Sequence, residues 1–385
     1  MSSQKQSHKP SQKQSSFISS RNDSGNITTF QIENINYSIA NALRRTILAD
    51  IPVLAFKTFP HHENEANFIK NTTRLNNEIL KQRLGCIPVH IKDLTNDYRN
   101  LVIEIKKVNE SESTEYVTTE HFRIKDITSD NYLSESATRK IFPPDPLTGD
   151  YIIFCRLKPR ISTELPGEEI DIEAKVSIRT ADENSSYNVT STCAYGMTVD
   201  KFAQDSKWQE IKEKIITDEM KKESIEIVKQ NWYNHEGKRH VIEDSYDFIL
   251  ETVGIYTNNE IMKLACDILV DRLTKLMNST QQDELNISKS ISTIKNCYDI
   301  ILPDIDYTIG KTVEYMLNKK FYKSTDTKNL SYIGFVKLHP HDSHSIIRMA
   351  FQDEDGDMIS LCKQNMMNSC KLCIDIFKDI KDDFD

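Results

Sequence analysis

Two long amphipathic helices, expected over residues 258–277 and 361–381, constrain the fold of this chain most. In each, apolar side chains recur every three or four positions and form one continuous stripe. Thr257 and Glu260 have the spacing of a capping box at the start of the first helix. Since a long helix with one apolar stripe needs a partner surface, we expect the two stripes to bury each other. The residues expected at this contact are Ile261, Leu264, Ile268, Leu269, Leu273 and Leu276 in the first helix and Leu372 and Ile376 in the second.

A degenerate repeat gives each long helix a similar unit upstream. The segment YSIANAL at 37–43 aligns with YTIGKTV at 307–313, and Ile47 then matches Leu317. In each copy we expect a strand first, then a short helix, and at the end one of the two long helices. Two such α+β units on one chain can bury their helical stripes in a pseudo-twofold pair. The predicted fold class is therefore α+β, with two paired modules.

Composition shifts along the chain predict how these modules are divided. The stretch from 61 to 205 contains short runs of β-forming residues separated by turn residues and is expected to be a β-rich insert within the first module. A charged stretch, 208–230, is expected to form one solvated helix. The predicted parts are a disordered Ser/Gln/Lys-rich tail (1–25), a first module split by the insert (26–60 and 206–277), the insert (61–205), a polar linker (278–292) and a second module (293–385).

Charge and cysteine content limit the classes of partner. The chain has 49 basic and 58 acidic residues, a net charge of −9, which argues against a protein that grips nucleic acid over a large basic face. No apolar run approaches the roughly 18 residues of a transmembrane helix, so no membrane contact is expected. The 8 cysteines are dispersed and are expected to be buried free thiols of a reducing compartment.

Two short segments make the chain recognisable. NALRRTILADIP (41–52) and RLGCIPVHI (83–91) resemble the third-largest subunit of eukaryotic RNA polymerase II, whose relatives are its archaeal counterpart and the bacterial alpha subunit. The stretch 251–276 is similar to the returning strand and dimerisation helix of that family. Farther on, 306–317 and 334–349 resemble the small eleventh subunit and its archaeal counterpart, with Gly310, His339 and Pro340 at the motif positions.

The resemblance implies a non-catalytic assembly subunit of a multisubunit DNA-directed RNA polymerase. The two halves would form the alpha-like heterodimer within one molecule and nucleate binding of the two largest subunits. A small tenth- or twelfth-subunit-like partner and little or no nucleic-acid contact are also implied. The residues implied at the interface with the second-largest subunit are Asn41, Arg44, Arg45, Arg83, Leu84, Gly85 and Pro88.

The fused arrangement resembles that of large DNA viruses of eukaryotes. It implies the host cytoplasm (the viral factory) and the virion as the location if the chain is viral, and the nucleus or an unknown location otherwise. Many relatives carry a cysteine cluster that binds zinc or an iron–sulfur cluster in the insert, whereas residues 87–154 contain no cysteine here. We therefore expect no metal in this domain and no cofactor.

An alternative function rests on the histidines His339, His341 and His344. Together with Asp342 they could hold a metal ion for hydrolysis. A third alternative is a self-associating binding protein, which would be multimeric when alone. Cys370 and Cys373 form a C-x-x-C pair, but two further ligands at matching spacing are lacking for a zinc site.

Overall fold

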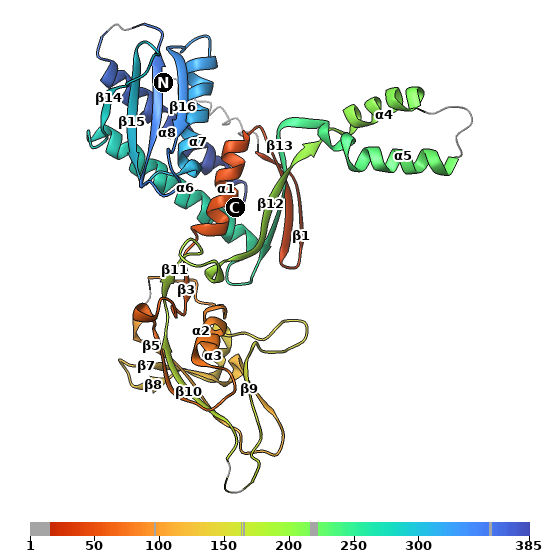
Figure 1. Ribbon diagram of the computed structural model, residues 1–385, viewed down its shortest axis with the longest axis vertical. Coiled ribbons are helices and arrows are strands. Elements are labelled where there is room, and N and C mark those ends of the chain that lie inside the picture. Colours follow the sequence, from red (N-terminus) through yellow and green to blue (C-terminus); the bar gives the residue numbers. More distant parts are fainter. Residues whose placement is uncertain (1–15, 96–97, 163, 165, 216–221, 354–355) are drawn as a thin grey trace, which may run out of the picture.

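The computed structural model describes residues 16–95, 98–162, 164, 166–215, 222–353 and 356–385. Figure 1 shows an upper body of helices and two sheets, a lower β-rich lobe, and a helical arm that projects from the upper body. The expected α+β fold class is confirmed, and the structure contains several antiparallel sheets. Among the described helices, none combines the length and the apolar content that crossing a membrane requires.

The first half of the upper body is a four-stranded antiparallel sheet with two helices. Its strand order is β1-β2-β13-β12, and Phe30 of β2 stands beside Phe248 of β13 with stacked rings. Only alternate residues of β2 are buried, so one face of the sheet is available to the helices. The elements are β1 (Ile18–Ser24), β2 (Ile27–Glu33), α1 (Tyr37–Ala49), β12 (Thr190–Val199), β13 (Val241–Thr252) and α6 (Asn258–Gln281).

The second half repeats this plan with a sheet of order β14-β15-β17-β16. Its short helix α7 begins at Tyr307, the position that the repeat aligns with Tyr37 at the start of α1. The elements are β14 (Ile287–Lys289), β15 (Cys297–Pro303), α7 (Tyr307–Leu317), a π-helical turn (Asn318–Lys323), β16 (Leu330–Val336), β17 (His344–Phe351) and α8 (Met358–Asp382).

Four helices from the two halves pack together between the sheets. α6 lies along α8, and α1 contacts both α6 and α7. A single continuous hydrophobic core runs through both halves. Ile261, Leu269, Leu273 and Leu276 of the predicted stripes are buried in it, and Leu264, Ile268, Leu372 and Ile376 pack against it while partly exposed.

The insert forms the lower lobe and has its own core. Its main sheet has the order β4-β10-β5-β7-β8, and β6 pairs with β9. β3 and β11 form a two-stranded ribbon at the junction with the upper body. The elements are β3 (Val53–Ala55), β4 (Ala66–Asn71), α2 (Asn77–Gly85), β5 (Leu101–Val108), β6 (Glu115–Thr118), β7 (Phe122–Asp126), β8 (Asn131–Tyr132), α3 (Glu135–Ile141), β9 (Ile153–Leu157), β10 (Glu169–Lys175) and β11 (Ser177–Arg179), with 3₁₀ turns at His61–Glu63, Tyr98–Asn100, Thr119–His121 and Ser185–Tyr187.

The structure moves both edges of the insert relative to the predicted 61–205. Leu54 and Phe56 already belong to the core of the insert, whereas Val189 and Cys193 belong to that of the upper body. β12, placed in the insert by sequence, pairs along β13 and completes the first sheet. Because β13 comes some fifty residues later in the chain, the sequence around β12 does not show that β12 belongs to the first sheet.

Three other segments differ from their predicted form. β1 lies within the predicted disordered tail, of which residues 1–15 are outside the described part of the chain. The predicted single helix at 208–230 is instead two helices, α4 (Lys201–Ile215) and α5 (Lys222–Asn234), followed by a 3₁₀ turn (Glu236–Arg239), with 216–221 outside the described residues. The predicted linker 278–292 contains the last turn of α6 and strand β14.

Candidate protein–protein interface

Helix α1 presents its polar side outward because its apolar side is fixed against the core. Asn36 caps the helix by accepting a hydrogen bond from the backbone N–H of Ser38. Ile39, Leu43 and Ile47 are buried at helical spacing. Asn41, Arg44 and Arg45 therefore fall on the other side of the helix, as the sequence predicts.

Asn41 and Arg44 form one polar unit on this outer side. Arg44 donates from Nε and Nη2 to the side-chain oxygen of Asn41 at 3.1 and 2.9 Å. Both side chains are half-buried. The guanidinium lies near Cys193 and Tyr195 of β12, where burial raises the pKa of the Cys193 thiol to about 12 and the positive charge opposes the rise. Arg44 is thus held in place by a neighbour in its own helix.

Arg45 makes contacts within the chain that the sequence did not predict, and its contact with the second-largest subunit stays a prediction. It reaches the N-terminus of α7, where its Nε donates to Thr308 Oγ1 at 2.9 Å and its Nη2 donates to Asp306 Oδ2 at 3.0 Å. Burial alone would raise the pKa of Asp306, but hydrogen bonds from Thr308 and Arg45 outweigh it and lower that pKa. Sequence reasoning missed Asp306 as a partner, although its place before Tyr307 and Thr308 is a recognisable helix cap.

The second predicted segment is the turn that ends α2. Leu84 is fully buried and Gly85 is buried against Thr58 and Phe56, so these residues support the surface from beneath. Arg83 is exposed, and its Nη2 donates to the carbonyl of Ile153 at 2.7 Å, which ties α2 to β9. Pro88 is half-buried. At this turn, the buried residues Leu84 and Gly85 therefore lie directly beside the exposed Arg83.

Two hollows border this turn. One, of about 200 Å³, lies at the junction of insert and upper body and is lined by Gly85, Ile87, Pro88, Tyr187 and Ile255, among others. The other, of about 360 Å³, is lined by Gln82, Arg83, Cys86, Ile87, Ile152 and Ile153. Ile152 and Ile153 are about half exposed, so the second hollow has an apolar rim. Concave apolar surfaces of this kind accept side chains of a protein partner.

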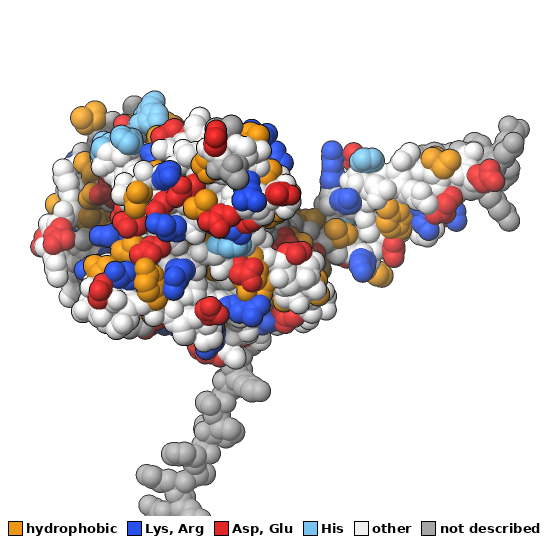
Figure 2. Space-filling view, turned by 90° about the horizontal axis from the view of Figure 1, so that it is seen from below, with side chains coloured by type: hydrophobic (Ala, Val, Ile, Leu, Met, Phe, Trp, Pro, Cys, Tyr) orange, Lys and Arg blue, Asp and Glu red, His pale blue; other side chains and the backbone are white. Residues whose placement is uncertain are grey.

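The face of the molecule that is seen from below carries mixed charge. Figure 2 shows lysine and arginine interspersed with aspartate and glutamate on the face seen from below. Within the sheet of the insert, Lys106 and Asp171 on neighbouring strands form one such pair of opposite charges, 2.7 Å apart. The face seen in Figure 2 thus has no continuous basic patch of the kind that binds phosphate backbones.

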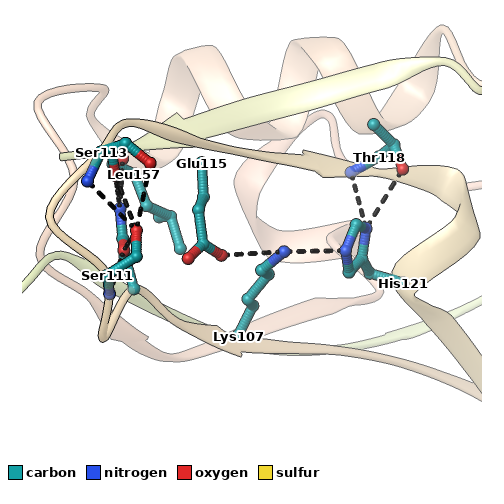
Figure 3. A network of polar contacts seen from close by, with 8 residues as sticks. Lys107, Ser111, Ser113, Glu115, Thr118, His121 and Leu157 are labelled. Carbon is teal, nitrogen blue, oxygen red and sulfur yellow. Dashed lines mark hydrogen bonds and ion pairs between the residues drawn. The ribbon is translucent and has the colours of Figure 1, made fainter. Parts of the chain in front are cut away.

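A polar network joins β5, β6 and the 3₁₀ turn Thr119–His121 of the insert (Figure 3). The ammonium of Lys107 lies 3.1 Å from Glu115 and 2.8 Å from Nε2 of His121. The other ring nitrogen of His121 faces the N–H and hydroxyl of Thr118. These groups satisfy one another, and no group of three or more histidine, cysteine or acidic side chains placed to hold a metal occurs among the described residues. The absence of a metal in this domain stays a prediction.

The histidine cluster lies in the exposed connection between β16 and β17. His339 and His341 are neighbours with ring centroids 5.2 Å apart, and the N–H of His341 donates to Nδ1 of His339. His344 begins β17, where it pairs with Pro303 of β15. The described residues thus bring two of the three histidines together without a third ligand. Gly310 belongs to the same motif as His339 and Pro340. It lies in α7, under the ring of Phe335.

The cysteines follow the predicted pattern with one exception. Seven are buried, and burial raises the pKa of the Cys370 thiol to about 12. Cys86, the residue that directly follows α2, is exposed. The C-x-x-C pair of α8 is therefore part of the core.

Comparison with known proteins agrees with this geometry. Residues 29–273 match the model of the RNA polymerase Rpb3/Rpb11 dimerisation domain. The chain is 23% identical over 279 residues to DNA-directed RNA polymerase subunit Rpo3 of Methanosphaera stadtmanae, covering 66% of this chain and 95% of that protein. It is 24% identical over 302 residues to DNA-directed RNA polymerases I and III subunit rpac1 of Dictyostelium discoideum, covering 66% and 81%. The chain therefore belongs to the RNA polymerase Rpb3/Rpb11 dimerisation domain family, as an Rpb3-like, non-catalytic polymerase subunit.

Proposed function

We propose that this chain is a single-chain assembly platform of a DNA-directed RNA polymerase. Its first half with the insert takes the place of the third-largest subunit, and its second half takes the place of the eleventh. The observation that carries this proposal is the one continuous core that α1 and α6 share with α7 and α8. In a polymerase with two separate subunits this contact would form between chains.

The match between the two halves supports the second part of the proposal. α1 and α7 both begin at a tyrosine, each behind a cap residue whose side chain accepts a backbone hydrogen bond. Both are followed by a sheet strand and a long helix with a buried stripe. The matched family model ends at residue 273, so the eleventh-subunit-like identity of the second half rests on this likeness and on the motif around Gly310.

The second-largest subunit is the proposed partner of the outer side of α1 and of the α2 turn. Asn41 and Arg44 offer a preorganised polar unit, and the planar guanidinium of Arg44 suits carboxylates or backbone carbonyls. Arg83 and Pro88 would form the neighbouring rim, supported by Leu84 and Gly85. The apolar hollow beside Ile152 and Ile153 would receive an apolar side chain of the partner.

The test is capture of the second-largest subunit by the tagged full chain. Arg44→Ala should leave the chain folded, since the side chain is half-buried and its bonds lie within one helix turn. Loss of a hydrogen-bonded arginine at an interface should weaken binding about tenfold. Arg239→Ala removes an exposed arginine from the arm and serves as the matched control. Equal capture by both variants would contradict the placement of this interface.

The other implied properties belong to the same proposal. The largest subunit, a small tenth- or twelfth-subunit-like partner, little direct contact with nucleic acid, and a viral source with a location in the host cytoplasm and the virion all follow from the resemblance. The two-histidine arrangement in the β16–β17 connection gives no support to the alternative of a metal-dependent hydrolase.

A further inference from the structure

A small ionic cluster joins the two halves at one corner of the helix layer. Arg45 of α1 donates to Asp306 and Thr308, and Asp306 in turn accepts hydrogen bonds from the N–H and the hydroxyl of Thr308. Arg45 thereby completes the cap of a helix in the other half. The residues in contact are separated by 261 and 263 positions in the sequence.

The cluster continues onto α6. Arg272 donates from Nη1 to Asp50 Oδ2 at 2.8 Å, and its charge also helps to lower the pKa of Asp306. Two arginines and two aspartates therefore alternate in charge across α1, α6 and α7. We call Arg45, Asp50, Arg272 and Asp306 the corner cluster.

The internal repeat shows which residues would replace those of the corner cluster if two like halves paired with each other. The aligned copies are offset by 270 residues, since Tyr37 matches Tyr307. Arg45 then matches Tyr315, and Asp306 matches Asn36. Tyr315 packs against the shared core and lies near Tyr246 of β13. The corner that contains Arg45 and Asp306 is therefore ionic. The corner related to it by the pseudo-twofold axis has Tyr315 and Asn36 at the matching positions and no such ion pair.

Pairing of like halves would lose this ion pair. Two first halves from different molecules would set Arg45 against Asn36, and two second halves would set Tyr315 against Asp306. Only the unlike pair puts a guanidinium at the carboxylate that caps the facing helix. A contact present in one pairing and absent in its competitors gives specificity even when its own strength is small.

We propose that Arg45 and Asp306 select pairing of the unlike halves within one chain over pairing of like halves between two chains. The inference rests on the proposed function, because it takes the halves as two dimerisation modules. The competing partner is a second copy of this chain. Arg45 then forms a contact within the molecule, whereas its neighbour Arg44 is available to a partner on the outer surface.

The pair is partly exposed, with 44% of the Arg45 and 32% of the Asp306 side chain accessible. Ion pairs of this exposure contribute a factor of about two to five in an equilibrium constant, and charge reversal should exceed that factor because it adds repulsion. The effect should therefore be measurable in self-association without unfolding the chain.

The test mixes two differently tagged copies of the full chain and measures how much of one is captured with the other. Arg45→Glu and Asp306→Arg should each raise cross-capture at least about threefold over wild type. Combining both substitutions restores an ion pair of reversed polarity and should return cross-capture to the wild-type level. Lys371→Glu, the same charge change at an exposed position of α8, is the matched control and should have no effect.

Two results would overturn the inference. Cross-capture of Arg45→Glu at the wild-type level would show that the corner cluster does not select the pairing, and so would a double variant that is not rescued. If circular dichroism shows that a charge reversal is unfolded, Arg45→Gln and Asp306→Asn are compared instead, with the same ranking expected. Failure of the wild-type chain to capture polymerase subunits would overturn the proposed function but would leave the self-association result standing.

Discussion

Gly310 lies where the second sheet approaches helix α7 closely. An added Cβ would lie 2.0 Å from Cε2 of Phe335, whose ring also packs edge-on against Tyr307 at 5.3 Å. Glycine inside a helix normally costs about 1 kcal/mol relative to alanine. The close approach of β16 to α7 therefore requires glycine at a position where helix propensity alone would favour alanine.

Gly310→Ala should consequently lower the free energy of unfolding by about 1–3 kcal/mol, because Phe335 must leave its position or α7 must shift. Gly196→Ala is the control, since no heavy atom lies within 4 Å of an added Cβ there. Its effect should stay within about 0.5 kcal/mol. Urea denaturation of both variants measures the difference, and a Gly310→Ala protein as stable as wild type would refute the packing argument.

Asp299 gives the second sheet a pH-dependent contribution to stability. It accepts two hydrogen bonds from Arg348 on the neighbouring strand, at 2.6 and 2.7 Å, and these lower the pKa of the carboxyl. The unfolded chain, with a pKa of about 3.9, then binds the proton more readily than the folded chain. This stability is therefore present above about pH 4 and is lost as the pH falls through the folded value.

Asp299→Asn should be less stable than wild type by about 1–2 kcal/mol at pH 6, and the gap should narrow at pH 3. Asp375→Asn, at an exposed position of α8, controls for the change in net charge. Thermal or urea unfolding at both pH values measures the effect. A gap that stays equal at pH 3 and pH 6 would show that the ion pair is not its origin.

At this scale the sequence predicted the placement of side chains on one helix better than their tertiary partners. The helical period put Asn41, Arg44 and Arg45 on the polar side of α1, where they lie. It could not predict that Arg45 turns to Asp306 while Arg44 stays with Asn41, because that choice depends on a residue 261 positions later in the chain. Leu84 and Gly85 matched a motif without revealing that they lie beneath the surface.

Among the elements, the end of α8 is what fastens the second half to the first sheet. Phe384 is 2% exposed, packs edge-on against Phe30 at 5.3 Å and lies under the guanidinium of Arg21. Asp383 accepts a hydrogen bond from the N–H of Phe17 at 2.7 Å. The end of α8 therefore contacts both the core face of the first sheet and the segment before β1.

Phe384→Ala should lower the free energy of unfolding by about 3 kcal/mol, the cost of emptying a buried phenylalanine site. Phe202→Ala, at a phenylalanine that is 82% exposed on the arm, is the matched control. Urea unfolding gives the comparison. Similar stability of the two variants would mean that the end of α8 contributes little to holding the halves together.

The helical arm is stabilised from within. Trp208 is buried against Trp232 and Tyr233, with ring centroids 5.7 and 6.0 Å away. Trp208→Ala should therefore speed hydrogen exchange in α4 and α5 and leave α6 and α8 protected as in wild type. Mass spectrometry of exchanged peptides measures this, and lost protection in α6 would show that the arm and the body unfold together.

Helices and strands were predicted correctly where buried residues recur at a regular spacing. They were missed where a strand is held in its sheet by backbone hydrogen bonds alone. α6 and α8 have long apolar stripes and were found from them. β1 is exposed along almost its whole length and is held by backbone pairing with β2, so its polar sequence gave no sign of a strand. β12 joins its sheet through β13, which follows only after the arm.

Across the whole molecule, the residues that the structure describes form two large hydrophobic cores that meet at a junction. One core is shared by both halves and the other belongs to the insert. At the junction, the hydroxyl of Tyr256 donates to the carbonyl of Pro52 at 3.0 Å, and that of Tyr187 to the carbonyl of Phe56 at 3.4 Å. The long apolar stripes predicted helices with a buried face, and the pairing of two modules stays a proposal. The sequence did not show where the core of the insert begins and ends.

The subunit composition of the polymerase that copurifies with the tagged full chain tests the central claim most directly. Native mass spectrometry of that complex gives the number of copies of each polypeptide. We expect one copy of this chain with the two largest subunits and no separate eleventh-subunit-like polypeptide, because the second half would occupy its place. A complex that contains such a separate polypeptide beside this chain would contradict the account, as would recovery of the chain without polymerase subunits.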